Sequence, residues 1–253
     1  MKPLKNHVLI YDTECPMCAL YTGVFTQYGW LEKNGRWNYS EVDKFEGCEL
    51  IDSNRSRHEI ALVDIDHKKV YYGLDSLFLI IGHKMPWLKP LFGNVIFQAI
   101  LKQVYNIISY NRKVIAPSLQ ENENSCVPDF HVPYRLLYII CLLVGVSIAG
   151  YYIDTVYGMK SYLVLGMGIF WLGSMLVSGY LAGVKALFYL GQLVTILAIA
   201  AMLAVPIAAC KQLVGHSIFI ESIAYLLSLF IFIQQVSKRI KICWREYTKS
   251  RKQ

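Results

Sequence analysis

Four long apolar segments in the C-terminal half of the chain constrain its fold more than any other feature. They cover residues 136–153, 161–182, 184–209 and 217–236 of a chain of 253. Each is about 18 to 26 residues long, which is enough to cross a hydrocarbon core about 30 Å thick at about 1.5 Å of helix rise per residue. Charged residues are nearly absent from these segments and gather near the breaks, which disfavours the buried helices of a soluble protein. The sequence therefore predicts an all-α transmembrane bundle of four helices.

The formal charge of +7 arises entirely in this C-terminal half. Residues 1–135 carry 15 Lys/Arg and 15 Asp/Glu, whereas residues 136–253 carry 10 Lys/Arg and 3 Asp/Glu, and seven of those ten bases lie in residues 237–253. Because this basic tail directly follows an apolar run, it indicates a membrane surface and not nucleic acid as the partner. The positive-inside rule predicts a cytoplasmic tail, and an even number of spans predicts that the N-terminal domain lies on the same side.

The first 115 residues predict a different kind of domain, in which short strands alternate with helices. Compact apolar and β-branched runs predict strands, and apolar residues that recur at the helical period predict helices. The expected strands are residues 7–12, 36–43, 59–64 and 70–72, and the expected helices are residues 15–33, 75–82 and 95–111, with a short helix or loop at 48–54. This order is typical of a thioredoxin-like α/β domain with a mixed sheet. Residues 116–135 are expected to form a polar linker.

The pattern that carries chemistry is Asp-Thr-Glu-Cys-Pro-Met-Cys at residues 12–18, where a predicted strand meets a predicted helix. A helix N-terminus presents unpaired N–H groups and a partial positive charge, which stabilise a thiolate at Cys15. Pro16 fits the first helical turn, where no N–H donor is lost. Cys18 lies within one turn and can resolve a mixed disulfide formed at Cys15. We expect Cys15 to be the nucleophile and Cys18 the resolving thiol, while Asp12 either relays a proton or only caps the turn.

A lone Cys-x-x-Cys pair is also half of a zinc site, so a metal-binding function stays open on these residues alone. The other ligands would have to come from Cys48, His58, His67, His83 or Cys126. Structural zinc sites are usually built from two close pairs, and the sequence has no second one, which favours redox chemistry without a metal. Inert structural thiols are the third interpretation.

Two further features keep a membrane-centred function open. Glu221, about one turn into the fourth predicted span, is either a functional intramembrane acid, with His216 as a proton partner, or a side chain that reaches the headgroups. The aromatic residues Trp87, Phe92 and Phe97 either rest on the bilayer or belong to a protein core. Besides redox catalysis and metal binding, a third possible function is a small transporter-like bundle of helices that the thiol domain regulates.

About 135 N-terminal residues resemble the DCC family of thiol-disulfide oxidoreductase-like proteins, called after an Asp-x-x-Cys-x-x-Cys signature. The resemblance is carried by residues 8–18 with the signature, residues 69–77 as a hairpin strand leading into a helix, and residues 105–112 and 125–128 as a closing Tyr…Asn-Arg helix and Cys-x-Pro tail. Residues 35–58 do not align. The resemblance implies a thioredoxin-like fold and protein-disulfide oxidoreductase activity at Cys15 and Cys18. It also makes Cys126 a candidate third redox thiol, against a structural role.

The sequence thus predicts an integral membrane thiol-disulfide oxidoreductase whose redox group is the Cys15–Cys18 dithiol, without a further cofactor. The expected partners are a protein disulfide or a small thiol, the lipid bilayer and, as an option, a membrane protein beside the anchor. Nucleic acid is not expected. The alternative is a Cys-x-x-Cys module that binds a metal or senses redox state and regulates the membrane bundle.

Overall fold

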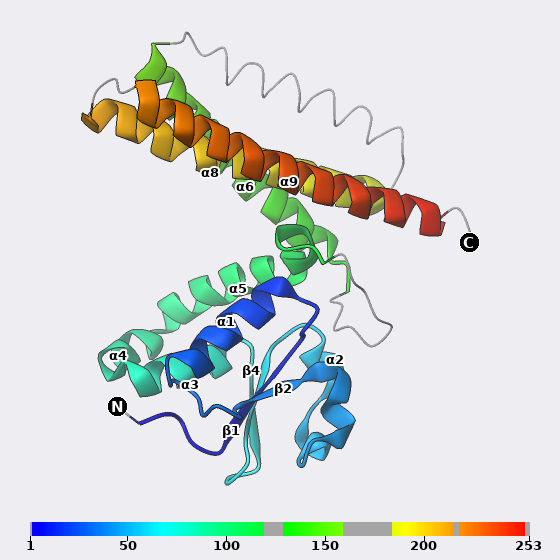
Figure 1. Ribbon diagram of the computed structural model, residues 1–253. Coiled ribbons are helices and arrows are strands. Elements are labelled where there is room, and N and C mark those ends of the chain that lie inside the picture. The colour runs from blue at the N-terminus through cyan, green and yellow to red at the C-terminus, as the bar shows by residue number, and fades with distance from the viewer. Residues whose placement is uncertain (1, 119–128, 159–183, 215–217, 251–253) are drawn as a thin grey trace. The chain divides into compact units, whose positions relative to one another are not determined.

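The chain divides into two units, Met1–His131 and Val132–Gln253. The computed structural model describes residues 2–118, 129–158, 184–214 and 218–250 (Figure 1). The first unit combines a small sheet with helices, and the second is built from long apolar helices.

The first unit is built on a four-stranded mixed sheet with the strand order β2-β1-β3-β4. β1 (His7–Tyr11) pairs in parallel with β2 (Arg36–Asn38) and antiparallel with β3 (Ala61–Asp64). β3 in turn forms an antiparallel hairpin with β4 (Lys69–Tyr72). Every residue of β3 is buried, as expected for a central strand covered on both faces. The mixed sheet expected from the apolar runs is therefore present.

β2 is shorter than the alternation over residues 36–43 predicts. Its pairing with β1 ends at Asn38, and a 3₁₀ helix, η1 (Tyr39–Lys44), follows. The Asn38 side chain accepts a hydrogen bond from the Ser40 N–H (3.2 Å), which caps η1. Such local side-chain bonds compete with the hydrogen bonds of a strand pair, and here residues 39–44 form a helix and do not continue the strand. The next elements are η2 (Cys48–Leu50) and α2 (Ser53–Ser56), in the segment for which a short helix or loop is predicted.

α1 (Pro16–Gln27) follows β1 and carries the dithiol at its start. Its buried residues recur at helical spacing, and they are Cys18, Thr22 and Phe25. The helix ends before residue 33, the predicted end, because Gly29 turns the chain with a φ of 63°. Glycine adopts this left-handed conformation without the steric cost that other residues meet.

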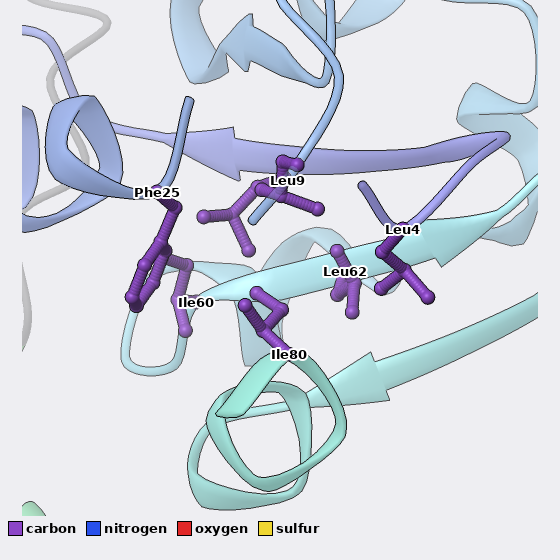
Figure 2. Close-up of a cluster of buried hydrophobic side chains, with 7 residues drawn as sticks. Leu4, Leu9, Phe25, Ile60, Leu62 and Ile80 are labelled. Atoms are coloured by element: carbon purple, nitrogen blue, oxygen red, sulfur yellow. The ribbon is translucent and has the colours of Figure 1, made fainter. Parts of the chain in front are cut away.

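Two hydrophobic clusters cover the two faces of the sheet. In the first, Leu9 of β1 and Leu62 of β3 meet Phe25 of α1 and Ile80 of the helix after β4 (Figure 2). The second cluster takes the alternate strand residues and covers them with the η1–α2 segment, and its buried members are Val8, Ile10, Phe45, Ile51, Ala61 and Val63. The period of two along β1 and β3 thus supplies both faces of the core.

Helices α3 (Leu74–Lys84), α4 (Lys89–Phe92) and α5 (Val95–Ile115) follow β4, with the short η3 (Pro86–Leu88) between the first two. Three side chains of α5 make hydrogen bonds to main-chain atoms just before β3. The pairs are Tyr105 with the Ile60 N–H (3.2 Å), Ser109 with the His58 carbonyl, and Arg112 with the Arg57 carbonyl (2.9 Å). These bonds fix one side of α5 to the segment that precedes β3.

The second unit contains three described helices that are long and apolar enough to span a membrane. They are α6 (Val132–Tyr157), α8 (Val184–Val214) and α9 (Ile218–Ser250). The protein is accordingly a membrane protein. The predicted span at residues 161–182 lies outside the described residues, so the count of four stays a prediction. In the first unit, η3 and α4 pass the same test only when joined to α5 across a bend of 92°.

The membrane helices extend beyond the predicted spans. α6 begins at Val132, inside the predicted linker, because Pro133 is suited to a first helical turn where its missing N–H costs nothing. α8 continues past Pro206 to Val214. α9 continues to Ser250 through most of the predicted basic tail, since the Lys, Arg and Glu residues there are good helix formers.

Hydrogen-bonded polar pairs join the helices of the second unit. The hydroxyls of Tyr138 on α6 and Thr195 on α8 lie 2.8 Å apart. Arg239 of α9 donates to the side-chain oxygen of Gln192 on α8. Polar side chains within an apolar bundle are stable when they bond across helices, and these pairs connect α8 to both neighbours.

Candidate dithiol site

Cys15 and Cys18 lie at the N-terminus of α1 as two buried, free thiols. Cys15 is the N-cap residue, and its Sγ accepts a hydrogen bond from the Cys18 main-chain N–H at 3.4 Å. Pro16 occupies the first helical turn, as its missing N–H allows. An N–H of the first turn of α1 therefore points at the Cys15 sulfur, where the partial positive charge of the helix end favours an anion.

The two thiols have opposite proton affinities. A hydrogen bond from the Cys18 thiol, aided by the Cys18 main-chain N–H and the charge of Arg112, lowers the pKa of Cys15 to about 6 against the opposing effect of burial. The same thiol–thiol hydrogen bond, together with burial, raises the pKa of Cys18. At neutral pH Cys15 is therefore mostly thiolate while Cys18 keeps its proton. The thiolate is the nucleophilic form of cysteine.

Arg112 reaches the dithiol site from α5. Its side chain is buried, donates a hydrogen bond to the Arg57 carbonyl and lines a small cleft together with Asp12 and Cys18. Its positive charge lowers the pKa of both Cys15 and Asp12. The pattern at residues 12–18 did not predict a role for Arg112. The one signal for it was its place in the Asn-Arg pair of the DCC resemblance.

Asp12 follows β1 and makes contacts that fit both of its predicted roles. Its carboxylate accepts the Glu14 N–H at 3.0 Å, as a turn cap does. Asp12 also lines the cleft, as Cys18 does. The cleft has a volume of about 10 Å³, which is close to the minimum that one water molecule needs. Burial raises the pKa of Asp12, which makes the carboxylate a better proton acceptor.

Three polar side chains from outside the 8–18 segment also line the cleft, namely Tyr39, Ser56 and Glu59. The sequence pattern gave no sign of them, because each comes from a segment with no chemical motif. Ser56 donates a hydrogen bond to the Asp52 carbonyl (2.6 Å), and Glu59 forms an ion pair with Arg55 (3.1 Å). These bonds show that Ser56 and Glu59 stabilise the segment around α2 that lies beside the dithiol.

Comparison of the chain with models of protein families, with curated proteins and with solved structures finds no match. The resemblance to the DCC family therefore depends on the residues that carry it. Two of its segments meet at the dithiol site, since residues 12–18 supply the thiols and Arg112 lines the same cleft. The preceding residue of that segment, Asn111, is fully buried.

The candidate zinc ligands that the structure describes do not gather around the dithiol. Among the described residues, no three His, Cys, Asp or Glu side chains come together as a metal ion would require. The described candidates have other surroundings: Cys48 lies in η2, His58 pairs with Asp129 (3.3 Å), His67 pairs with Asp64 (2.8 Å), and His83 contacts the Lys2 carbonyl (3.2 Å). Cys126 lies outside the described residues, and its role as a third thiol stays a prediction.

The remaining predicted residues fall in two segments, residues 216–221 and residues 87–97. Glu221 belongs to the first turn of α9, but its side chain and His216 are outside what the structure describes, so a function for them stays a prediction. The three aromatic residues differ in their surroundings. Trp87 is largely exposed and Phe97 is half-buried, whereas Phe92 stacks on Phe78 with ring centroids 4.3 Å apart.

Proposed function

We propose that this protein is a membrane-anchored thiol-disulfide oxidoreductase that cycles Cys15 and Cys18 between dithiol and disulfide. One observation carries the proposal. The Cys15 sulfur sits at a helix N-terminus, accepts hydrogen bonds from Cys18 and has a pKa lowered to about 6, while the pKa of Cys18 is raised. A reactive thiolate beside a protonated partner is the arrangement that nucleophile and resolving thiol require.

We also propose a thioredoxin-like fold for the first unit. The support is its topology, in which parallel β1 and β2 flank α1 in the chain and an antiparallel β3–β4 hairpin follows. The dithiol begins the helix that follows β1. The resemblance of residues 8–18 and 105–112 to the DCC family supports the same assignment.

In the reductive direction, the Cys15 thiolate attacks one sulfur of a substrate disulfide. The substrate S–S bond breaks, a disulfide forms between Cys15 and the substrate, and the displaced substrate sulfur leaves as a thiolate that takes up a proton. Cys18 then loses its proton and attacks the Cys15 sulfur, which forms the Cys15–Cys18 disulfide and releases the second substrate thiol. Two electrons pass to the substrate, and two molecules of a small thiol or one protein dithiol return them and become a disulfide.

Asp12 is our proposed acceptor for the Cys18 proton. The two residues line one cleft whose volume fits a single water molecule, through which the proton can pass. Because burial raises its pKa, Asp12 binds that proton more tightly than an exposed carboxylate does. Arg112, in the same cleft, stabilises the thiolate state of Cys15 before the attack.

The test is the pH profile of Cys15 alkylation in the full-length protein, with the Cys15→Ser variant as the blank. We expect a midpoint near pH 6 and a Cys15–Cys18 disulfide after equilibration with a glutathione buffer. A midpoint near the ordinary cysteine value of about 8.5, together with no disulfide under mild oxidant, would refute the proposed function.

A further inference from the structure

One side of α5 is an exposed apolar surface. Ile96, Ile100, Val104 and Ile108 follow one another at four-residue intervals and therefore line one side of the helix. Each is exposed, from 73% at Ile96 to 40% at Ile108, and Trp87 before the helix is 74% exposed. We call these four aliphatic residues the α5 apolar face. A contiguous apolar surface of this kind marks an interaction site, whereas single exposed apolar residues do not.

The segment around the α5 apolar face carries only positive charge. No Asp or Glu occurs between Asp75 and Glu121, but five bases do: Lys84, Lys89, Lys102, Arg112 and Lys113. Arg112 is buried at the dithiol site, whereas Lys89 and Lys102 are exposed. At about 100° of helix rotation per residue, Lys102 lies on the side of α5 opposite the apolar face. An apolar face with a basic opposite side is the pattern of a helix that lies in the interface of a bilayer with anionic lipids, because the headgroups attract the bases while the apolar side chains enter the acyl region.

The other side of α5 shows that this helix does not cross the membrane. Tyr105, Ser109 and Arg112 bond there to main-chain atoms of residues 57–60. A spanning α5 would have to break these bonds or take the polar main chain of that segment into hydrocarbon, where each unsatisfied group costs several kcal/mol. If a helix held in this way meets a bilayer, it does so along the membrane surface and not across it.

We propose that the α5 apolar face lies in the headgroup–acyl boundary of an anionic lipid bilayer, as an interfacial amphipathic helix. The same chain brings α5 near a bilayer, since α6 is a candidate membrane span that begins at Val132. The chain from Ile115 to Val132 can extend over at most about 60 Å. This surface contact is distinct from the spans, and it does not depend on the proposed thiol chemistry.

Site-specific photocrosslinking in the full-length protein tests the proposal. Benzoylphenylalanine replaces Ile100, which is 58% exposed, or Ile65 as the matched control, which is 44% exposed. Ile65 lies in the β3–β4 turn, at the end of the first unit away from α5 (Figure 1). Both proteins are reconstituted into phosphatidylcholine vesicles with or without phosphatidylglycerol and irradiated, and mass spectrometry identifies the adducts.

We expect lipid adducts at position 100 to exceed those at position 65 several-fold and to fall several-fold when phosphatidylglycerol is omitted. Equal adducts at the two positions would overturn the proposal. So would crosslinks from position 100 to this chain or to a second copy in place of lipid. Circular dichroism of both proteins checks that they are folded. The same experiment in a Cys15→Ser background should give unchanged lipid adducts, which separates this inference from the proposed function.

Discussion

At the scale of single residues, the thiol–thiol hydrogen bond is the largest cause of the lowered Cys15 pKa. Cys18→Ala removes that donor and leaves the main-chain N–H in place. We expect the midpoint of the Cys15 alkylation profile to rise from about pH 6 by at least about one unit, toward the ordinary value of about 8.5. The variant should also accumulate the mixed disulfide, because no resolving thiol remains. An unchanged midpoint would assign the low pKa to the helix N-terminus and Arg112 without the Cys18 thiol.

Arg112 offers a second residue-scale test, because its charge also lowers the pKa of Cys15. Arg112→Gln should raise the alkylation midpoint, and Arg112→Lys, which keeps the charge, should restore much of the shift. The matched control is Lys102→Gln, which removes an exposed cation from the same helix and should leave the midpoint where it is. Loss of the bond to the Arg57 carbonyl is expected to cost about 1–3 kcal/mol of stability, so the midpoint and not activity is the deciding readout.

Asp12→Asn should move the two steps of the reaction in opposite directions. Its charge raises the pKa of Cys15, so the variant should show a lower alkylation midpoint. If Asp12 accepts the Cys18 proton, release of the mixed disulfide should slow by about 10²-fold or more. The asparagine oxygen can still accept the Glu14 N–H, which preserves the turn. A release rate equal to that of the unmodified protein would leave Asp12 with the capping role only.

The residues of the dithiol site differ in how far the sequence could predict them. Cys15, Cys18 and Asp12 form a short local pattern, and their meaning follows from the strand–helix junction at which they occur. Arg112 lies far along the chain, and its position at the cleft depends on which side of α5 faces the sheet. Helical periodicity identifies an apolar face, but it does not say which buried polar residue on the other side meets the thiols.

At the scale of elements, patterns of period two and 3.6 predicted β1, β3, β4, α1, α3 and α5, but not α4 or the 3₁₀ helices η1 and η3. Their ends were predicted less well, for local reasons. Asn38 ends β2 early through its bond to the Ser40 N–H, and Pro133 lets α6 begin inside the predicted linker. Both effects arise from one side chain and its nearest main-chain neighbours, which a periodicity averaged over many residues does not resolve.

The central strand supplies an element-scale prediction. Leu62 of β3 is fully buried against Leu9, Phe25 and Ile80, so Leu62→Ala leaves a cavity in the first cluster. We expect a loss of about 2–5 kcal/mol in the stability of the first unit. Alkylation of the buried Cys18 during a urea titration in detergent follows the unfolding. Leu20→Ala is the control, since Leu20 is 71% exposed and its truncation should change stability by no more than about 0.5 kcal/mol.

At the scale of the whole molecule, the bases of α9 bear on the side of the membrane that holds the dithiol. Bases accumulate in the C-terminal part of α9, from Lys238 onward, where the helix continues past its apolar region. The positive-inside rule then predicts a cytoplasmic end for α9. α6, with 26 residues and a length of about 39 Å, is long enough to have its two ends on opposite sides of the bilayer.

Labelling with a membrane-impermeant thiol reagent tests this topology, using single cysteines in a chain whose native cysteines are replaced by serine. Leu20→Cys reports on the first unit, and Thr155→Cys, also exposed, reports on the far end of α6. We expect Thr155→Cys to be labelled in intact cells and Leu20→Cys only after permeabilisation. The reverse pattern would place the dithiol outside the cytoplasm, where disulfides persist and the electrons would flow from substrate thiols to the Cys15–Cys18 disulfide. The direction of exchange in the cell thus depends on the number of spans between Val132 and the basic end of α9.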